Sequence, residues 1–131
     1  MRALLDTHVL VQWVCGSDNL TDAHRQIVGA ATEAEPLWVS DISLWEISTL
    51  VRLGRLRLRL PLRDWLEAAV AAPLVRRVSI SPAVAAEASA LPASLHRDPA
   101  DRIIVASARA TGATLLTRDR RIIEAGIVDT A

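Results

Sequence analysis

The chain has 131 residues, of which 51% are hydrophobic and 23% charged, a length and composition that predict one globular domain over residues 1–131. Its 15 basic residues balance its 15 acidic ones, which disfavours both a generally basic protein that coats nucleic acid and an acidic disordered tail. All 15 basic residues are arginines and the only aromatic residues are four tryptophans, which excludes lysine-dependent chemistry and base-stacking platforms built on Phe or Tyr.

Cysteine usage and hydropathy favour an intracellular protein. Cys15 is the only cysteine, so the chain cannot form an internal disulfide. The sequence shows no leader-like start, and no apolar run approaches the roughly 20 residues that a membrane-spanning helix needs. We therefore expect a cytoplasmic protein with no membrane partner.

Short apolar runs alternate with helix-like segments along the whole chain. We expect, in chain order, a strand over 2–6, helices over 7–14 and 21–34, a strand over 37–39, a helix opened by Ser40 or Ser43 and ending at 53, an extended segment over 55–60, a helix over 62–72, a strand over 74–80, helices over 82–90 and 99–111, a strand over 114–117 and a short helix before 127–128. This alternation predicts an α/β fold with three layers, in which helices cover both faces of a short, mostly parallel central sheet.

Several acids fall where a predicted strand ends and a helix begins. In a parallel α/β sheet, ligand sites lie outside the carboxyl ends of the strands. The acids at or near these positions are Asp6, Asp41, Glu46, Asp101 and Asp119. We therefore expect carboxylates to converge at one end of the sheet.

Helix capping offers a competing explanation for each acid taken singly. Asp98 precedes a helix that starts at a proline and has Asp101 in its first turn, and Ser43-x-x-Glu46 matches a capping box. Ser, Thr or Asn would cap equally well, however, and several acids share one sheet edge. Without lysine, and with no arginine expected beside each acid, the counter-charge that we expect is a divalent metal, Mg²⁺ or Mn²⁺.

A hard metal ion in a carboxylate cluster favours the cleavage of phosphate esters, because it lowers the pKa of water and screens phosphoryl charge. Residues 51–80 carry 7 arginines against 2 acids. This arginine-rich segment would accommodate a polyanionic backbone, although a solvent-facing strand face explains the same alternation. The candidate RNA-binding residues are Arg52, Arg55, Arg57 and Arg59.

Other enzyme classes with acidic sites fit less well. Phosphatases of the haloacid-dehalogenase type and response-regulator receivers both need a lysine, which this chain lacks. The three histidines do not show zinc-ligand spacing, and we expect only His96 to lie near the acids.

Four segments together resemble a known family. They are Leu4-Leu5-Asp6-Thr7, Ser40-Asp41-Ile42-Ser43-Leu44-Trp45-Glu46-Ile47, Asp98-Pro99-Ala100-Asp101-Arg102-Ile103-Ile104-Val105-Ala106 and Leu115-Leu116-Thr117-Arg118-Asp119. In order and spacing they are similar to the motifs of PIN-domain ribonucleases, specifically the VapC toxins of type II toxin–antitoxin systems. The resemblance covers essentially the whole chain.

The resemblance implies an acidic quartet formed by Asp6, Glu46, Asp101 and Asp119. Asp6 and Asp101 would contact the metal, Asp119 would hold the metal or its waters, and Glu46 would position or deprotonate the attacking water. Supporting roles, through hydrogen bonds around the metal ligands, fall to Thr7, Asp98 and Thr117.

The family implies a Mg²⁺-dependent endoribonuclease acting on a structured cellular RNA such as transfer or ribosomal RNA. It also implies a homodimer and a cognate VapB-type antitoxin whose C-terminal segment blocks the acidic site, with contacts that we expect near residues 45–65. Two alternatives stay open: a catalytically silent PIN-like module that binds RNA or a partner, and a metal-dependent phosphatase or DNA nuclease that uses the same acids.

Overall fold

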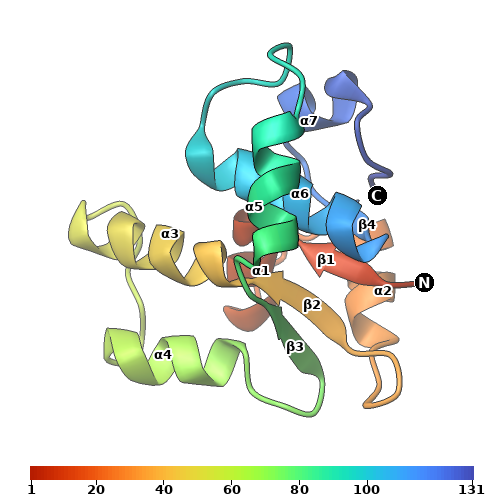
Figure 1. Cartoon of the computed structure of the whole chain (residues 1–131). Helices are drawn as coiled ribbons and strands as arrows, with labels where there is room; N and C mark the ends of the chain where they lie inside the picture. Colours follow the sequence, from red (N-terminus) through yellow and green to blue (C-terminus); the bar gives the residue numbers. More distant parts are fainter.

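Seven helices surround a four-stranded parallel sheet in the computed structural model, which describes residues 1–131 (Figure 1). The elements are β1 (Ala3–Leu5), α1 (Thr7–Val14), α2 (Asp22–Gly29), β2 (Leu37–Ser40), α3 (Asp41–Arg52), α4 (Leu62–Ala69), β3 (Val75–Val78), α5 (Pro82–Ala90), α6 (Pro99–Thr111), β4 (Thr114–Leu116) and α7 (Arg120–Ala125). The strand order is β3-β2-β1-β4, and every neighbouring pair is parallel.

The sheet separates two apolar cores. Leu5 packs into one core with side chains of α1 to α4, whereas Leu4 packs into the other with side chains of α5 to α7. Both leucines are fully buried, because β1 is a central strand and its alternating side chains point into opposite layers. The predicted three-layer arrangement with a short parallel sheet is confirmed.

Helix starts agree with the prediction where a capping residue fixes the first turn. The bounds of α1, α5 and α6 are those predicted. The side chains of Asp6, Asp98 and Asp119 each accept a backbone hydrogen bond at the start of α1, α6 and α7, respectively. Gly112 ends α6 in the left-handed conformation, with a φ of 67°, which a residue with a Cβ adopts at a cost.

Two predicted helices were too long. The helix α2 ends at Gly29 rather than near residue 34, because Thr32 and Glu35 form a local turn in which the Glu35 N–H donates to the Thr32 hydroxyl. The helix α4 ends at Ala69 rather than near residue 72, and Pro73 disfavours helical backbone at the residue before it.

The segment over 55–60 is a loop between α3 and α4 rather than an extended strand. Gly54 turns the chain with a φ of 72°, and Leu56 and Leu58 then pack partly buried against the core beside α1. The alternation of Leu and Arg therefore comes from a loop in which these two leucines face the core and the arginines face solvent. The helices on either side of this loop, α3 and α4, project together beyond the sheet (Figure 1).

The capping-box interpretation of Ser43 was wrong. Ser40 caps α3, and its hydroxyl accepts from the Ile42 N–H at 3.3 Å. Ser43 lies three positions after this cap, inside the helix, and is fully buried, with its hydroxyl 2.9 Å from the Thr7 hydroxyl. This contact ties α3 to the start of α1.

None of the seven helices combines the length and apolar character that crossing a lipid bilayer demands.

Candidate active site

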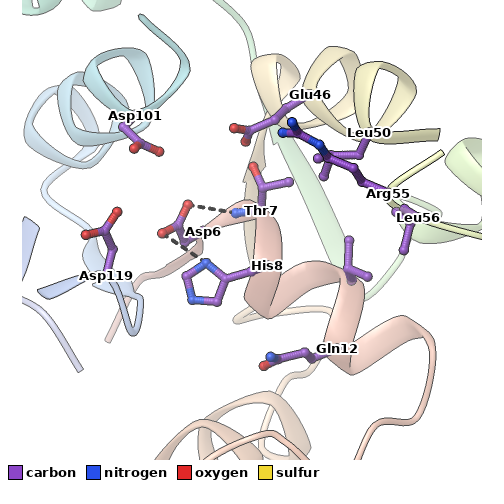
Figure 2. A pocket seen from close by; sticks show the side chains of 11 residues that line it. Asp6, Thr7, His8, Gln12, Glu46, Leu50, Arg55, Leu56, Asp101 and Asp119 are labelled. Carbon is purple, nitrogen blue, oxygen red and sulfur yellow. Dashed lines mark hydrogen bonds and ion pairs between the residues drawn. The ribbon is translucent and has the colours of Figure 1, made fainter. Parts of the chain in front are cut away.

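The four predicted quartet acids line one pocket at the carboxyl end of the sheet (Figure 2). Asp6 follows β1 directly, Asp119 follows β4 after two residues, and the other two acids come from α3 and α6. The cavity measures about 290 Å³. Asp6, Asp101 and Asp119 gather at one end, Leu50, Arg55 and Leu56 lie at the other, and Glu46 lies between the two groups (Figure 2).

Asp6 is the most buried acid of the pocket, with 3% of its surface exposed. Its Oδ1 accepts the Thr7 backbone N–H at 2.8 Å, and its Oδ2 accepts the Thr117 hydroxyl at 2.6 Å. The Thr117 hydroxyl oxygen also accepts the Asp119 backbone N–H at 3.0 Å. Thr117 thus couples the carboxylate that follows β1 to the backbone that follows β4.

His8 adds a contact to Asp6 that the sequence analysis did not predict. The His8 Nε2 accepts the Arg118 backbone N–H at 3.1 Å, so in the neutral ring the proton resides on Nδ1. This Nδ1 faces the Asp6 Oδ2 at 3.4 Å. The residue type gives no signal for this role, because it depends on how the loop after β4 passes over α1.

Asp101 is the acid shared by two groups of possible metal ligands. Glu46, Asp98 and Asp101 offer carboxylate oxygens that all lie within 4.8 Å of one another, and His96, Asp101 and Asp119 form a second such group. Closely spaced carboxylate oxygens are the ligands that Mg²⁺ and Mn²⁺ prefer. The residues present therefore fit a divalent cation.

His96 approaches Asp101 as the sequence suggested, and the two side chains are in direct contact. The His96 Nε2 lies 2.6 Å from the Asp101 Oδ2, and both side chains are largely buried. The other ring nitrogen, Nδ1, is buried without a hydrogen-bond partner. The bond to Asp101 is thus the polar contact that orients this ring.

Burial raises the pKa of both Glu46 and Asp101 above its ordinary value, and the surrounding carboxylates, Asp6 and Asp98 among them, raise it further. The Thr7 side chain opposes this effect at Glu46, and His96 opposes it at Asp101. Ionisation of both carboxyl groups in the folded protein is therefore unfavourable compared with ionisation in water.

The pKa of Asp119 is shifted in the opposite direction. Burial acts to raise its pKa, but hydrogen bonds and charge from Arg121 outweigh burial, so that the pKa of Asp119 lies below its ordinary value. The expectation that no arginine adjoins the acids was wrong at this position. Arg121 lies two residues after the α7 cap, where the first helical turn returns it to the capping carboxylate.

The raised pKa of Glu46 predicts a pH-dependent gain in stability for Glu46→Gln in the metal-free protein. Between the ordinary pKa of Glu46 and its raised folded value, the folded chain binds more protons than the unfolded chain, so stability falls as the pH rises. Gln carries no charge, and E46Q should therefore melt above the wild type at neutral pH. The gain should disappear as the pH falls through the raised pKa to the ordinary one.

Thermal melts of E46Q and wild type from acidic to neutral pH, in the presence of a chelator, measure this difference. The control is Glu67→Gln, which removes an exposed α4 acid that pairs with Arg63 at 3.2 Å, far from the cluster in sequence and outside the pocket lining. A gain for E46Q that did not change with pH would contradict this explanation.

Not every predicted site residue joins the pocket. Asp41 pairs with Arg77 on β3 at 2.7 Å and does not line the pocket. Among the four candidate RNA-binding arginines, all exposed, only Arg55 lines it. Thr117 and Asp98 support the acids from outside the lining, and the Asp98 Oδ1 accepts the Asp101 backbone N–H at 3.2 Å.

Comparison with known proteins gives a consistent match. The family model of the PIN domain matches residues 3–128. Ribonuclease VapC22 of Mycobacterium tuberculosis is 42% identical over 119 residues, which covers 91% of this chain and 88% of that protein.

Solved structures with lower identity share the fold. The structure of VapBC2 from Rickettsia felis bound to a DNA fragment from their promoter superposes with a TM-score of 0.73 at 15% identity, over 100% of this chain and 98% of the other. The structure of FitAcB from Neisseria gonorrhoeae has a TM-score of 0.69 at 20% identity, over 98% and 95% of the two chains.

Proposed function

Because this chain belongs to the PIN-domain family, we propose that it is a metal-dependent endoribonuclease toxin of the VapC type, neutralised by a cognate VapB-type antitoxin. The observation that carries this proposal is the convergence of Asp6, Glu46, Asp101 and Asp119 on one pocket that fits a divalent cation. The 42% identity to a ribonuclease supports RNA as the substrate.

Asp6, Asp101 and Asp119 are the residues that we propose as metal ligands, with Mg²⁺ as the ion and Mn²⁺ as its substitute. When bound, such an ion lowers the pKa of water and screens the charge of a phosphodiester. Thr7 and Thr117 fix the Asp6 carboxylate through its two oxygens, and Asp98 holds the first turn of α6 that carries Asp101.

Glu46 is suited to accept the proton of the attacking water. It lies on α3, across the pocket from Asp119 (Figure 2). A general base works best when its pKa lies near the working pH, and burial moves the pKa of Glu46 in that direction. We therefore propose that Glu46 acts as the general base and is not a fourth metal ligand.

Arg55 is the arginine that we place against the RNA phosphates closest to the acids. It lines the same pocket as Glu46, at the end opposite Asp119 (Figure 2). Arg52, Arg57 and Arg59 are exposed near Arg55 in the sequence and would contact RNA phosphates farther from the site. The substrate class that we propose is structured cellular RNA in the cytoplasm, transfer or ribosomal RNA.

The antitoxin that we propose covers the acidic pocket and the projecting α3 and α4. Trp45 on α3 is 61% exposed and available for such a contact, whereas Trp65 on α4 is buried in the core. The homodimer stays a prediction from the family.

Incubation of the purified chain with total cellular RNA in Mg²⁺, Mn²⁺ or EDTA tests the function. We expect discrete fragments with either metal and intact RNA with EDTA, and sequencing of the fragment ends would then identify the RNA. A folded, metal-binding protein that binds RNA equally with and without Mg²⁺ and cleaves nothing would indicate a silent module. Preferential cleavage of DNA or of small phosphate esters in competition would indicate a different phosphoesterase.

A further inference from the structure

The Arg121 side chain reaches two of the acids in the pocket. Its Nε lies 3.3 Å from the Asp119 Oδ1, and its Nη2 lies 3.2 Å from the Asp119 Oδ2. The same Nη2 lies 3.8 Å from the Asp101 Oδ2. The Arg121 side chain is 63% exposed, whereas those of Asp101 and Asp119 are 11% and 19% exposed. The guanidinium therefore approaches largely buried carboxylates from the solvent side.

Helix capping does not require this side chain. The Asp119 Oδ1 already accepts the Arg121 backbone N–H at 2.9 Å, which satisfies the start of α7 for any residue at that position except proline. The neighbouring Arg120 makes the ordinary surface pair of a helix, with Glu124 at 3.5 Å. Of these two arginines, only Arg121 reaches an acid on another helix, Asp101 on α6, which lies twenty positions earlier in the chain.

The oxygens that Arg121 contacts belong to carboxylates that would also hold the metal. Asp101, Asp119 and His96 form one of the two groups whose ligand atoms lie within 4.8 Å of one another. A guanidinium and a divalent cation are drawn to the same lone pairs, and two cations in that space repel each other.

We propose that Arg121 is a resident counter-cation, which holds Asp101 and Asp119 in place in the metal-free protein and must leave their oxygens for the site to load. This inference rests on the proposed metal-dependent function. Arg121 acts here as a positioning residue, because it works through the two carboxylates and contacts no reacting atom. Because Arg121 competes with the metal for these oxygens, it raises the metal concentration that is needed to fill the site.

Calorimetric titration of Arg121→Gln and wild type with MnCl₂ and MgCl₂ tests the proposal. We expect R121Q to bind Mn²⁺ about threefold to tenfold more tightly, since the competing pair is charge-assisted but partly exposed to solvent. The metal-free melting temperature of R121Q should be lower than that of wild type, and its rise on metal addition larger. The matched control Arg120→Gln should bind metal as the wild type does.

Arg121→Lys keeps the charge but not the two-pronged contact with Asp119, so its affinity for Mn²⁺ should lie between those of wild type and R121Q. This variant also tests the proposal if R121Q does not fold. If wild type binds Mn²⁺ and R121Q binds it equally or more weakly, the counter-cation role is overturned and the proposed function stands. If the folded wild type binds neither metal, both are overturned.

Discussion

Asp101→Asn should abolish metal-dependent RNA cleavage, with a fall in rate of about three orders of magnitude, and leave the fold intact. Asp101 is the acid common to both groups of possible metal ligands, so its charge contributes to holding the cation however the other acids share it. Asn preserves the size of the side chain and one oxygen, but removes the charge. Gel analysis of total RNA incubated with each protein in Mg²⁺ measures the loss.

The folded state should tolerate this change. Burial raises the pKa of Asp101, so the ionised carboxylate costs stability in the metal-free protein, and a neutral isostere removes that cost. The metal-free melting temperature of D101N should therefore equal or exceed that of the wild type. The control Asp41→Asn removes an acid that pairs with Arg77 outside the pocket, and it should leave cleavage unchanged. A D101N protein that cleaved RNA as the wild type does would contradict the assigned site.

Leu5→Ala should be the most damaging of these changes to stability, at a cost of about 2–5 kcal/mol in the free energy of unfolding. Leu5 is fully buried in the central strand β1, in the core that also contains Val39 and Leu116 from the strands on either side. The lost methyl groups leave a cavity that strands bonded on both sides cannot close. Urea denaturation followed by circular dichroism measures the shift.

Leu60→Ala provides the matched comparison, because the same truncation falls on a side chain that is 50% exposed in the loop before α4. Its cost should stay within about 0.5 kcal/mol. L5A should also lose cleavage activity below its melting temperature, since Leu5 packs in the same core as Leu116, whose carbonyl accepts the Asp6 backbone N–H at 3.0 Å. Equal urea midpoints for the two variants would refute the two-core description of the sheet.

The sequence predicted the converging acids because their positions follow from topology. Asp6 and Asp119 follow strands, and parallel strands end at one edge, so their proximity needs no side-chain detail. Glu46 lies in the second turn of the helix that follows β2, so its place near this edge also follows from topology, whereas its role came from the resemblance to PIN-domain ribonucleases. The capping positions of Asp6, Asp98 and Asp119 follow local rules that the sequence displays directly.

Contacts set by strand order and by side-chain conformation could not be predicted. Asp41 and Asp101 both stand in the first turn of a helix, but Asp41 meets Arg77 because β3 pairs with β2, and the sequence does not specify that order. Arg121 looks like any arginine of a short surface helix until its conformation over Asp101 is known. The loop after Gly54 has the alternation of a strand, but its leucines meet a core instead of a neighbouring strand.

The pairing of β4 with β1 determines at which stage of synthesis the sheet is complete. Ala3 lies beside Thr114 in the register of this pair, so the first strand of the chain waits for the last one before the sheet is complete. Closing so long a loop carries a large entropic cost and is favourable only once the intervening layers are formed. A nascent chain that displays Asp6 and Glu46 still lacks Thr117 and Asp119. The acidic pocket is therefore complete only after β4 has joined β1, near the end of synthesis.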